Sequence, residues 1–241
     1  MVRVRIWMTA ASLVAMLFAV VHPGHASDSA PSGTWTVAFS SVEAETLSSF
    51  ATTGIKRGMN LPNDPQSLFV SASTGVSLSD GHRARMGKID AGQIDMQARL
   101  MIGFERAFPQ FFMSFGLGPS LARIKSSNGT FSSNQAGVVG QLDLWWRPRD
   151  DLSLSLASVG DTAEQSWWNR VRIGWRPLGL PFALGPEASA SVGRNWSKLK
   201  AGFHIGDIKF WKLGFDASGG WMIDEKNRKG SYISAALYLR Y

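Results

Sequence analysis

The chain has 241 residues, 44% of them hydrophobic, with ten tryptophans, no cysteine and a formal charge of +7 at pH 7. Without cysteine it can form no disulfide, and its positive excess is not gathered into a run that would favour a nucleic-acid partner. A mean hydropathy of −0.05 fits both soluble proteins and barrels of alternating strands, so periodicity must separate these classes.

The first residues have the features of an export signal. Arg3 and Arg5 precede an apolar run over 8–21, and Gly24 and Ala26 supply the small residues of a cleavage site. The apolar run is shorter than the roughly 18 residues that a membrane helix needs. We therefore expect a signal peptide over 1–26, removed to leave a single domain over 27–241. No later segment is long and apolar enough for a membrane helix, so any membrane must be crossed by strands.

Alternating and β-branched runs, separated by turn signals, predict twelve strands after the signal. The expected ranges are 33–43, 46–56, 66–78, 93–106, 110–124, 137–147, 151–158, 166–176, 182–192, 198–205, 210–222 and 231–241. Bacterial single-chain barrels have an even number of strands, and ten is the alternative count.

The clearest strands lie between residues 136 and 193. In the segment QLDLWWRP, the apolar Leu142, Leu144 and Trp146 alternate with Gln141 and Asp143. A period of two predicts a strand with one apolar and one polar face. Pro148, the last residue of this segment, marks the end of the predicted strand, because proline cannot donate a hydrogen bond to a sheet ladder.

The polar face of 166–176 favours one architecture, because Arg170 and Arg172 are neighbours on it. Two unpaired guanidinium groups are costly in a dry core but stay hydrated in a water-filled lumen. We therefore predict an all-β fold, a transmembrane antiparallel up-and-down β-barrel of about 12 strands in the outer membrane. Trp146, Trp175 and Tyr241 are expected at the membrane interface, and a closing aromatic such as Tyr241 is typical of outer-membrane barrels. A soluble β-sandwich or closed soluble barrel is the alternative.

The connections between predicted strands alternate in length. AFPQ, PRDD, PLGLP and GDIK are short, whereas SDGHRARMGKIDAG, KSSNGTFSSNQ, VGDTAEQ and DEKNRKG are longer and polar. Outer-membrane barrels alternate short periplasmic turns with longer external loops, so the short set is expected on the periplasmic side. RGMNLPNDP, over 57–65, is long where this scheme expects a short turn.

The polar faces of the predicted strands assemble a set of lumen residues. The candidates for polysaccharide contact or structural pairing are Gln141, Asp143, Arg170, Arg172, Glu187, Lys198, Lys200, His204, Lys212 and Asp216. Further polar-face residues are Asp95, Gln97, Arg99, Glu105, Arg147, Arg176 and Arg240. Two interpretations stay open: a polar tunnel for a hydrated chain, or a small barrel plugged by its own salt-bridged side chains.

The segment GPEAS places Glu187 on the polar face, opposite the arginines of the preceding strand. We expect its carboxylate to pair with them. Pro186 and Pro119 both fall inside predicted strands, where proline predicts a bulge or a bend.

The segments QLDLWWRP at 141–148, WWNRVRIGWR at 167–176 and GPEAS at 185–189, with the glycine-rich closing strands, resemble the cellulose biosynthesis protein BcsS family. The resemblance is carried by the C-terminal half of the chain. It implies an exported accessory protein of cellulose or related exopolysaccharide production, and it implies no catalytic residues.

We therefore predict a non-catalytic outer-membrane accessory or channel component of cellulose or exopolysaccharide secretion, with no cofactor and no metal site. Its expected partners are outer-membrane lipid, the polysaccharide and other synthase or export components, and not nucleic acid. One alternative is a lipid-active outer-membrane enzyme, with His204 as the candidate base. Asp143 and Glu187 are the candidate carboxylates for glycoside hydrolysis. Another alternative is a soluble periplasmic binding module.

Overall fold

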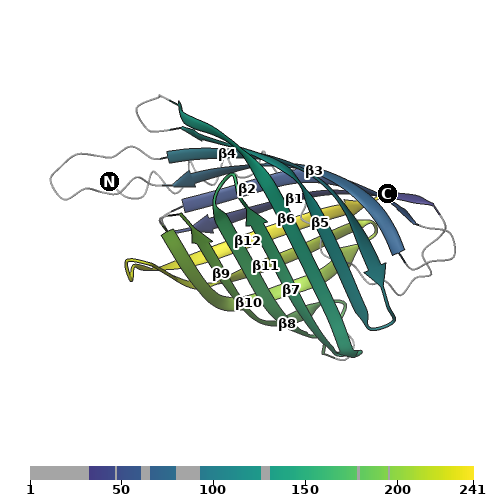
Figure 1. Cartoon of the computed structure of the whole chain (residues 1–241). Helices are drawn as coiled ribbons and strands as arrows, with labels where there is room; N and C mark the ends of the chain where they lie inside the picture. Colours follow the sequence, from purple (N-terminus) through teal and green to yellow (C-terminus); the bar gives the residue numbers. More distant parts are fainter. Residues whose placement is uncertain are drawn as a thin grey trace.

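The computed structural model describes residues 33–46, 48–60, 66–79, 93–125, 131–177, 180–194 and 196–241. The predicted signal peptide over 1–26 lies outside the described residues. Twelve antiparallel strands form one closed barrel, in which each strand pairs with its neighbours in sequence and β1 pairs with β12 (Figure 1). The predicted all-β barrel and its count of twelve strands are confirmed.

The strands correspond closely to the predicted segments. They are β1 (Thr34–Glu45), β2 (Ser48–Asn60), β3 (Gln66–Ser79), β4 (Gln93–Ala107), β5 (Phe111–Lys125), β6 (Phe131–Arg149), β7 (Leu152–Asp161), β8 (Ser166–Trp175), β9 (Ala183–Gly193), β10 (Trp196–Phe210), β11 (Leu213–Asp224) and β12 (Lys229–Arg240). The barrel closes where β1 pairs with β12, from the Val37–Arg240 pair to the Glu45–Tyr232 pair. We call this junction the seam, and it leaves no open sheet edge. Among the described residues, no helix is long and apolar enough to cross a membrane.

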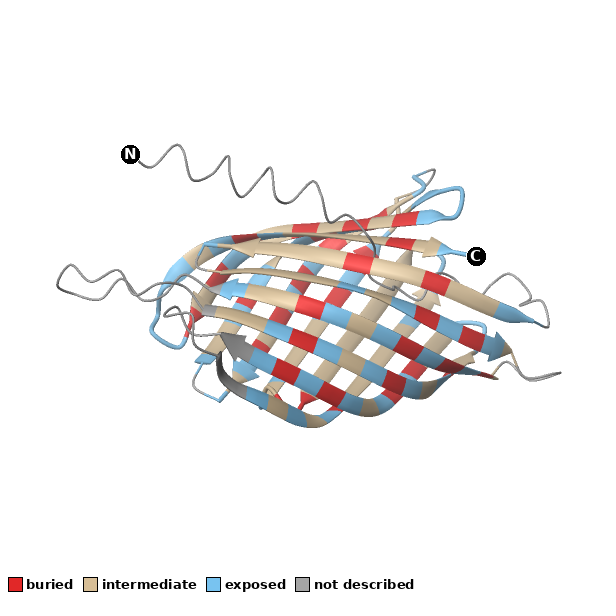
Figure 2. Cartoon of the chain, turned by 90° about the horizontal axis from the view of Figure 1, so that it is seen from above, coloured by how far each residue is buried: buried red, intermediate tan, exposed pale blue. Residues whose placement is uncertain are grey.

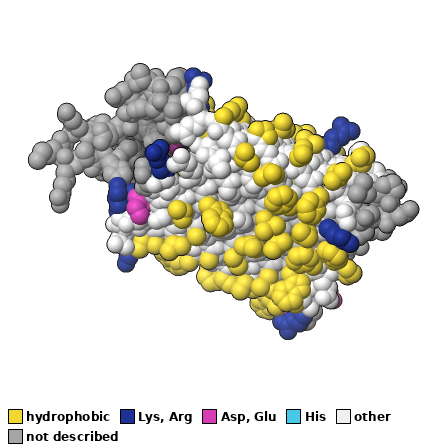
Figure 3. Space-filling view, viewed as in Figure 1, with side chains coloured by type: hydrophobic (Ala, Val, Ile, Leu, Met, Phe, Trp, Pro, Cys, Tyr) yellow, Lys and Arg dark blue, Asp and Glu magenta, His cyan; other side chains and the backbone are white. Residues whose placement is uncertain are grey.

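The two faces of the barrel wall differ in polarity. Along β9, Gly185, Glu187 and Ser189 are buried, and Pro186 and Ala188 between them are exposed. Figure 2 shows a similar alternation along several other strands, whereas β7 is of intermediate exposure along most of its length. In a closed barrel the buried face points inward, so the interior is polar and the outer surface is apolar. Figure 3 shows the hydrophobic side chains gathered over the middle of the outer surface, with the Lys and Arg side chains toward its ends.

The two ends of the barrel carry different connections. The short-turn end, as we call it, holds the connections at residues 108–110, 150–151 and 211–212, together with the C-terminal residue Tyr241. The loop end holds the connections at 162–165 and 225–228. The predicted connection at 57–65 is shorter than expected, because β2 continues to Asn60. Residues 61–65 lie outside the described ranges.

Two predicted boundaries were wrong. Strand β6 begins at Phe131, so most of the expected loop KSSNGTFSSNQ is strand or lies outside the described residues. The expected turn GDIK at 206–209 lies inside β10, and the register of β10 with β11 shifts between Ile205 and Ile208. Asp207 adopts a φ of 60° there, so the Gly-Asp pair forms a β-bulge and the chain turns at Trp211 and Lys212.

Pro119 and Pro186 each follow a glycine within a strand and interrupt one ladder. Strand β8 pairs with β9 at Arg172–Glu187 and at Trp175–Leu184, with no pair between them, so Pro186 has no partner in β8. Strands β4 and β5 leave the same gap at Pro119. On its other side, each proline remains paired with the neighbouring strand. The predicted bend is therefore a one-sided gap in the hydrogen-bond ladder, where proline has no N–H to offer.

Exposed aromatic residues lie near both ends of the outer surface. Trp146, Trp175 and Tyr241 are exposed near the short-turn end, where β6, β8 and β12 end. Trp167 and Trp196 are exposed at the loop end, where β8 and β10 begin. The apolar band therefore lies between two groups of tryptophans, an arrangement typical of transmembrane barrels.

Candidate functional site

The inner face of β7 is lined by small side chains. Its inward residues Ser153, Ser155 and Ala157 are each partly accessible rather than buried. They lie between the longer polar side chains of β6 and β8, because Ala157 pairs with Asp143 on one side and with Arg170 on the other. The small side chains of β7 therefore leave part of its inner face accessible.

Polar groups border this strip of small residues. On β6 the Gln141 side-chain amide donates to the Asp143 carboxylate at 2.6 Å. On β8 the Arg170 guanidinium lies 5.0 Å from the centroid of the Trp168 ring. The strip thus combines hydroxyl, amide, carboxylate and guanidinium groups with an aromatic ring, which together can bind a hydroxyl-rich chain.

Glu187 is the centre of the first buried polar cluster. Its carboxylate accepts from the guanidinium of Arg172 on the neighbouring strand, and their side chains are 3% and 4% exposed. It also accepts from the Ser218 hydroxyl at 3.0 Å and from the Tyr232 hydroxyl at 3.2 Å. These contacts join β8, β9, β11 and β12 and satisfy a carboxylate that would be costly to bury alone.

Lys200 is the centre of a second cluster, which joins β10 to β1. Its ammonium binds the carboxylate of Glu43 and lies 2.6 Å from a carboxylate oxygen of Glu45. Lys198, two residues earlier on the same face, also reaches Glu45 at 2.5 Å and the Ser48 hydroxyl at 2.9 Å. Two lysines and two glutamates therefore neutralise one another near the barrel seam.

A third cluster lies on the inner face of β2, β4 and β5. Lys56 binds the Glu105 carboxylate and the Ser114 hydroxyl, the latter at 3.2 Å. The Lys56 ammonium also lies 3.8 Å from the centroid of the Phe69 ring. The two polar partners of this buried lysine come from different strands, so the contact braces the wall formed by β2 to β5.

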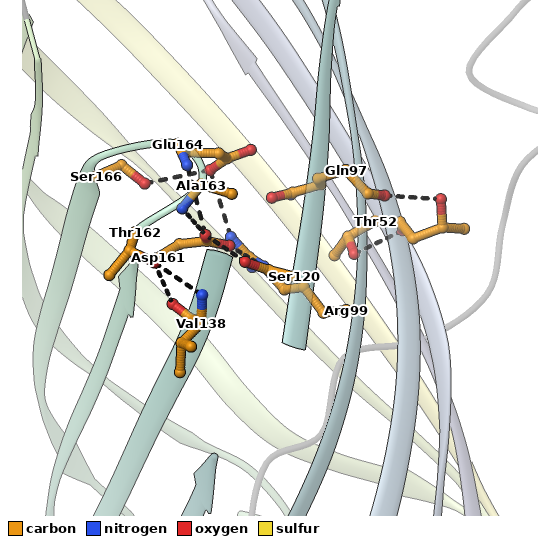
Figure 4. A network of polar contacts seen from close by, with 11 residues as sticks. Thr52, Gln97, Arg99, Ser120, Val138, Asp161, Thr162, Ala163, Glu164 and Ser166 are labelled. Carbon is orange, nitrogen blue, oxygen red and sulfur yellow. Dashed lines mark hydrogen bonds and ion pairs between the residues drawn. The ribbon is translucent and has the colours of Figure 1, made fainter. Parts of the chain in front are cut away.

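The turn between β7 and β8 dips into the barrel at the loop end (Figure 4). Ala163 of this turn is 2% exposed, and Asp161 accepts from the Ser120 hydroxyl of β5 at 2.7 Å. Arg99 of β4 holds the turn from across the lumen, with its Nε 3.0 Å from Asp161 and its Nη2 3.4 Å from Glu164. Arg99 of β4 therefore holds this turn in place at the loop end of the barrel.

Burial raises the pKa of the Glu164 carboxyl, and the nearby charge of Arg99 opposes this shift without cancelling it. The stabilising contribution of this group is therefore complete at acidic pH, below its unfolded pKa, and is lost as the pH rises through the raised folded pKa. We expect Glu164→Gln to raise the midpoint of thermal unfolding at neutral pH, with the advantage over wild type shrinking toward pH 4. Thermal unfolding of both proteins, followed by electrophoretic mobility between pH 4 and 8, tests this; a growing advantage toward low pH contradicts it.

The structure places most of the predicted lumen residues on the inner face. Arg172, Glu187 and Lys200 are the members of the buried clusters described above. His204 and Asp216 are also buried, on β10 and β11. Gln141, Asp143, Arg170 and Lys198 are intermediate in exposure and face the same interior.

The prediction for Lys212 was wrong. This lysine lies in the turn between β10 and β11 and is exposed. Its ammonium lies 5.2 Å from the centroid of the Trp211 ring and 5.9 Å from that of Tyr241. The bulge at Asp207 moves the turn along the chain, so that position 212 is no longer part of a strand.

Several residues of the clusters were missed by sequence reasoning. They are Glu43, Glu45, Lys56, Asp161, Glu164, Ser218 and Tyr232. The spacing of Glu43 and Glu45 by two residues was a usable signal, because it places both on one strand face. Asp161 carried none, because it falls where the predicted strand 151–158 had already ended.

Within the described ranges, no group of three or more His, Asp or Glu side chains is arranged to hold a metal ion. The charged clusters are built instead from pairs of opposite sign. The arrangement can bind and orient a hydrated polar chain through hydrogen bonds. Its strip of small residues on β7 is partly accessible from the lumen.

Solved structures of similar shape are β-barrels with little sequence in common with this chain. A deletion mutant of the monoaromatic hydrocarbon channel TodX, deltaS2, is 8% identical, covers 88% of this chain and 90% of its own, and gives a TM-score of 0.53. The TodX deltaS2S3 mutant is 8% identical, with 88% and 91% covered and a TM-score of 0.51. The translocator domain of the autotransporter NalP from Neisseria meningitidis is 11% identical, with 98% and 96% covered and a TM-score of 0.49.

The two TodX structures share the fold of this chain, which is that of the outer-membrane β-barrels. The chain belongs to the cellulose biosynthesis protein BcsS family, whose model matches residues 37–241. The predicted resemblance is thus confirmed and extends through the N-terminal half, beyond the segments that first indicated it. Sequence comparison with curated proteins gives no match.

Proposed function

We propose that this protein is an exported outer-membrane component of cellulose or related exopolysaccharide secretion, and that its lumen is a polar passage for the polysaccharide. Family membership supports the pathway, and the apolar band between two groups of tryptophans supports insertion into lipid. The signal-like residues 1–26 support export. The short-turn end then faces the periplasm and the loop end faces outward. The role carries no catalytic step, and other synthase or export components are its expected partners.

The strip of small residues along β7 is the observation that carries this proposal. Its hydroxyl and methyl groups remain partly accessible, and polar groups of β6 and β8 border it. A hydrated polysaccharide needs accessible space bordered by polar groups, because its hydroxyls must exchange water for protein partners along the path. The buried clusters brace the remaining wall, and the β7–β8 turn covers the outer mouth until the chain passes.

Filling the strip should stop secretion without unfolding the barrel. Ala157→Trp adds a large ring on the inner face of β7, whereas Leu156→Trp adds one on the outer face and serves as the matched control. In a strain that lacks the chromosomal gene, we expect Ala157→Trp to leave secreted cellulose at the level of the deletion. Leu156→Trp should restore the wild-type amount. Secreted cellulose is measured by dye binding and by cellulase-released glucose.

The folded state of each variant is checked in the outer-membrane fraction by the mobility shift between unboiled and boiled samples. If Ala157→Trp is folded and secretes normally, the lumen is not the path. If the deletion itself leaves cellulose unchanged, the role in secretion is wrong. If the wild-type protein is found in the soluble periplasmic fraction, its assignment to the outer membrane is wrong.

A further inference from the structure

A half-open pocket lies at the short-turn end of the lumen, where the small-residue strip of β7 begins. It is lined by the ends of β6, β7 and β8, by the start of β9 and by the bulge of β10. Its floor consists of Ser153 and Gly174, which are paired across β7 and β8, and of Ala183. If this protein passes a polysaccharide, the chain reaches this pocket first from the periplasm.

Gly174 is closely packed at the floor of the pocket. A Cβ at this position would lie 2.6 Å from the Ser153 hydroxyl, 3.4 Å from the Ala183 side chain and 3.8 Å from Nε2 of His204. Any larger residue would therefore occupy the space between these three side chains. The lack of a side chain at position 174 therefore lets Ser153 and Ala183 pack closely at the floor of the pocket.

The walls of the pocket combine one aromatic ring with planar charged groups. Trp145 lines one side, with the Arg147 guanidinium 5.4 Å from its ring centroid. On the other side Arg176 is paired with Asp207, whose carboxylate lies 2.7 Å from Nη2 of the arginine. The Trp145, Arg176 and Asp207 side chains are each partly accessible.

The bulge in β10 is what presents Asp207 to the pocket. Its backbone is left-handed, with a φ of 60°, and its N–H donates to the Asp216 carboxylate at 3.1 Å. A non-glycine residue in this conformation stores strain that the surrounding structure must support. Bulges commonly redirect a side chain toward a binding site, and here the redirected group is a carboxylate beside a guanidinium.

We infer that a neutral glucan segment binds at the open mouth of this pocket, with one pyranose ring stacked on Trp145 and its hydroxyls bound by Arg176 and Asp207. This inference rests on the proposed function and names its first binding site. Aromatic rings offer a flat apolar surface to the C–H face of a sugar, and guanidinium and carboxylate groups bind neighbouring hydroxyls in pairs. The charged residues in the lining are two arginines and three aspartates, so the pocket has no positive excess that would select an anionic polysaccharide.

Calorimetric titration of the purified full chain, in a detergent without a sugar headgroup, tests the inference. Cellotetraose is the neutral probe and tetragalacturonate is the anionic one. We expect heat from cellotetraose only, with the association constant lowered about two- to tenfold by Trp145→Leu, as expected for loss of aromatic stacking. Trp146→Leu is the matched control, because it removes the neighbouring tryptophan from the outer face of the same strand.

Arg176→Gln is the second variant, used if Trp145→Leu does not fold, and it should also weaken cellotetraose binding. Absence of cellotetraose binding, preference for tetragalacturonate, or equal binding by Trp145→Leu and Trp146→Leu would each overturn the site. The site and the proposed function fail separately. If cellotetraose does not bind but Ala157→Trp still stops secretion, only the site is wrong. If cellotetraose binds at Trp145 but Ala157→Trp secretes normally, the site stands and the passage is wrong.

Discussion

Replacing Lys200 with Met should destabilise the barrel by about 3–5 kcal/mol, the typical cost of removing one partner from a buried ion cluster. Lys200 is 5% exposed and is the ammonium that Glu43 and Glu45 share. Without it, two carboxylates near the seam repel each other, with only Lys198 left beside Glu45. The measurement is the free energy of unfolding in urea, for protein refolded into phospholipid vesicles and followed by tryptophan fluorescence.

Lys198→Met is the matched control, because this lysine carries the same charge on the same strand face. Its side chain is 23% exposed and it reaches only Glu45 of the pair, so we expect a loss of about 1 kcal/mol. Adding Glu43→Gln and Glu45→Gln to Lys200→Met should recover most of the stability, since the uncompensated charge is then gone. Equal losses from Lys200→Met and Lys198→Met would contradict the shared role of Lys200 at the seam.

Gly185→Ala should destabilise the barrel by about 3 kcal/mol, the upper part of the range for overpacking. A Cβ at Gly185 would fall well inside the van der Waals radius of the Ile173 carbonyl oxygen, which is backbone and has no rotamer through which to escape. Gly118 precedes Pro119, and a Cβ there would come equally close to the carbonyl oxygen of Leu100. Gly118→Ala should therefore destabilise the barrel by a similar amount. The stability of both variants is measured as the temperature at which the folded form disappears from the electrophoresis gel.

Gly160→Ala is the control for these variants. Gly160 also lies within a strand, but a Cβ there would meet nothing within 4 Å. Its effect should stay within about 0.5 kcal/mol, because only the backbone and not the packing is altered. If Gly185→Ala and Gly160→Ala melt together, strand β8 does not need to approach β9 at the Gly-Pro pair.

The interior of this barrel is held by specific charge pairs rather than by an apolar core. Among the described residues, one compact apolar group is found, formed by Val37 and Tyr238 with neighbouring side chains. Elsewhere Glu187 and Lys56 each collect partners from several strands, and Lys200 holds two glutamates of β1. Such clusters give little net stability over apolar packing, but they are intolerant of losing one member. They therefore hold the strands that they join at fixed positions, and the proposed passage follows the β7 strip, whose small side chains stay partly accessible.

The strands, their faces and the family could be predicted from the sequence because these features are local. Alternation around Leu142 and Gln141 follows from the two-residue repeat of a strand, whatever the rest of the chain does. The adjacent Arg170 and Arg172 required a polar interior, and this favoured a barrel over a dry core. Proline at 186 and glycine at 185 marked an irregularity in the wall, although not its one-sided form.

The partners of the inner side chains were decided only by the tertiary structure. Lys200 meets Glu43 across 157 residues of sequence, and Tyr232 meets Glu187 across two intervening strands. Such meetings depend on the register of all twelve ladders and on the stagger at which the barrel closes, and a strand's own pattern contains neither. The Gly-Asp pair at 206–207 shows the same limit. Alone it signals a turn, but pairing with β11 on one side and β9 on the other makes it a bulge, which leaves Lys212 outside the lumen and turns Asp207 toward the pocket.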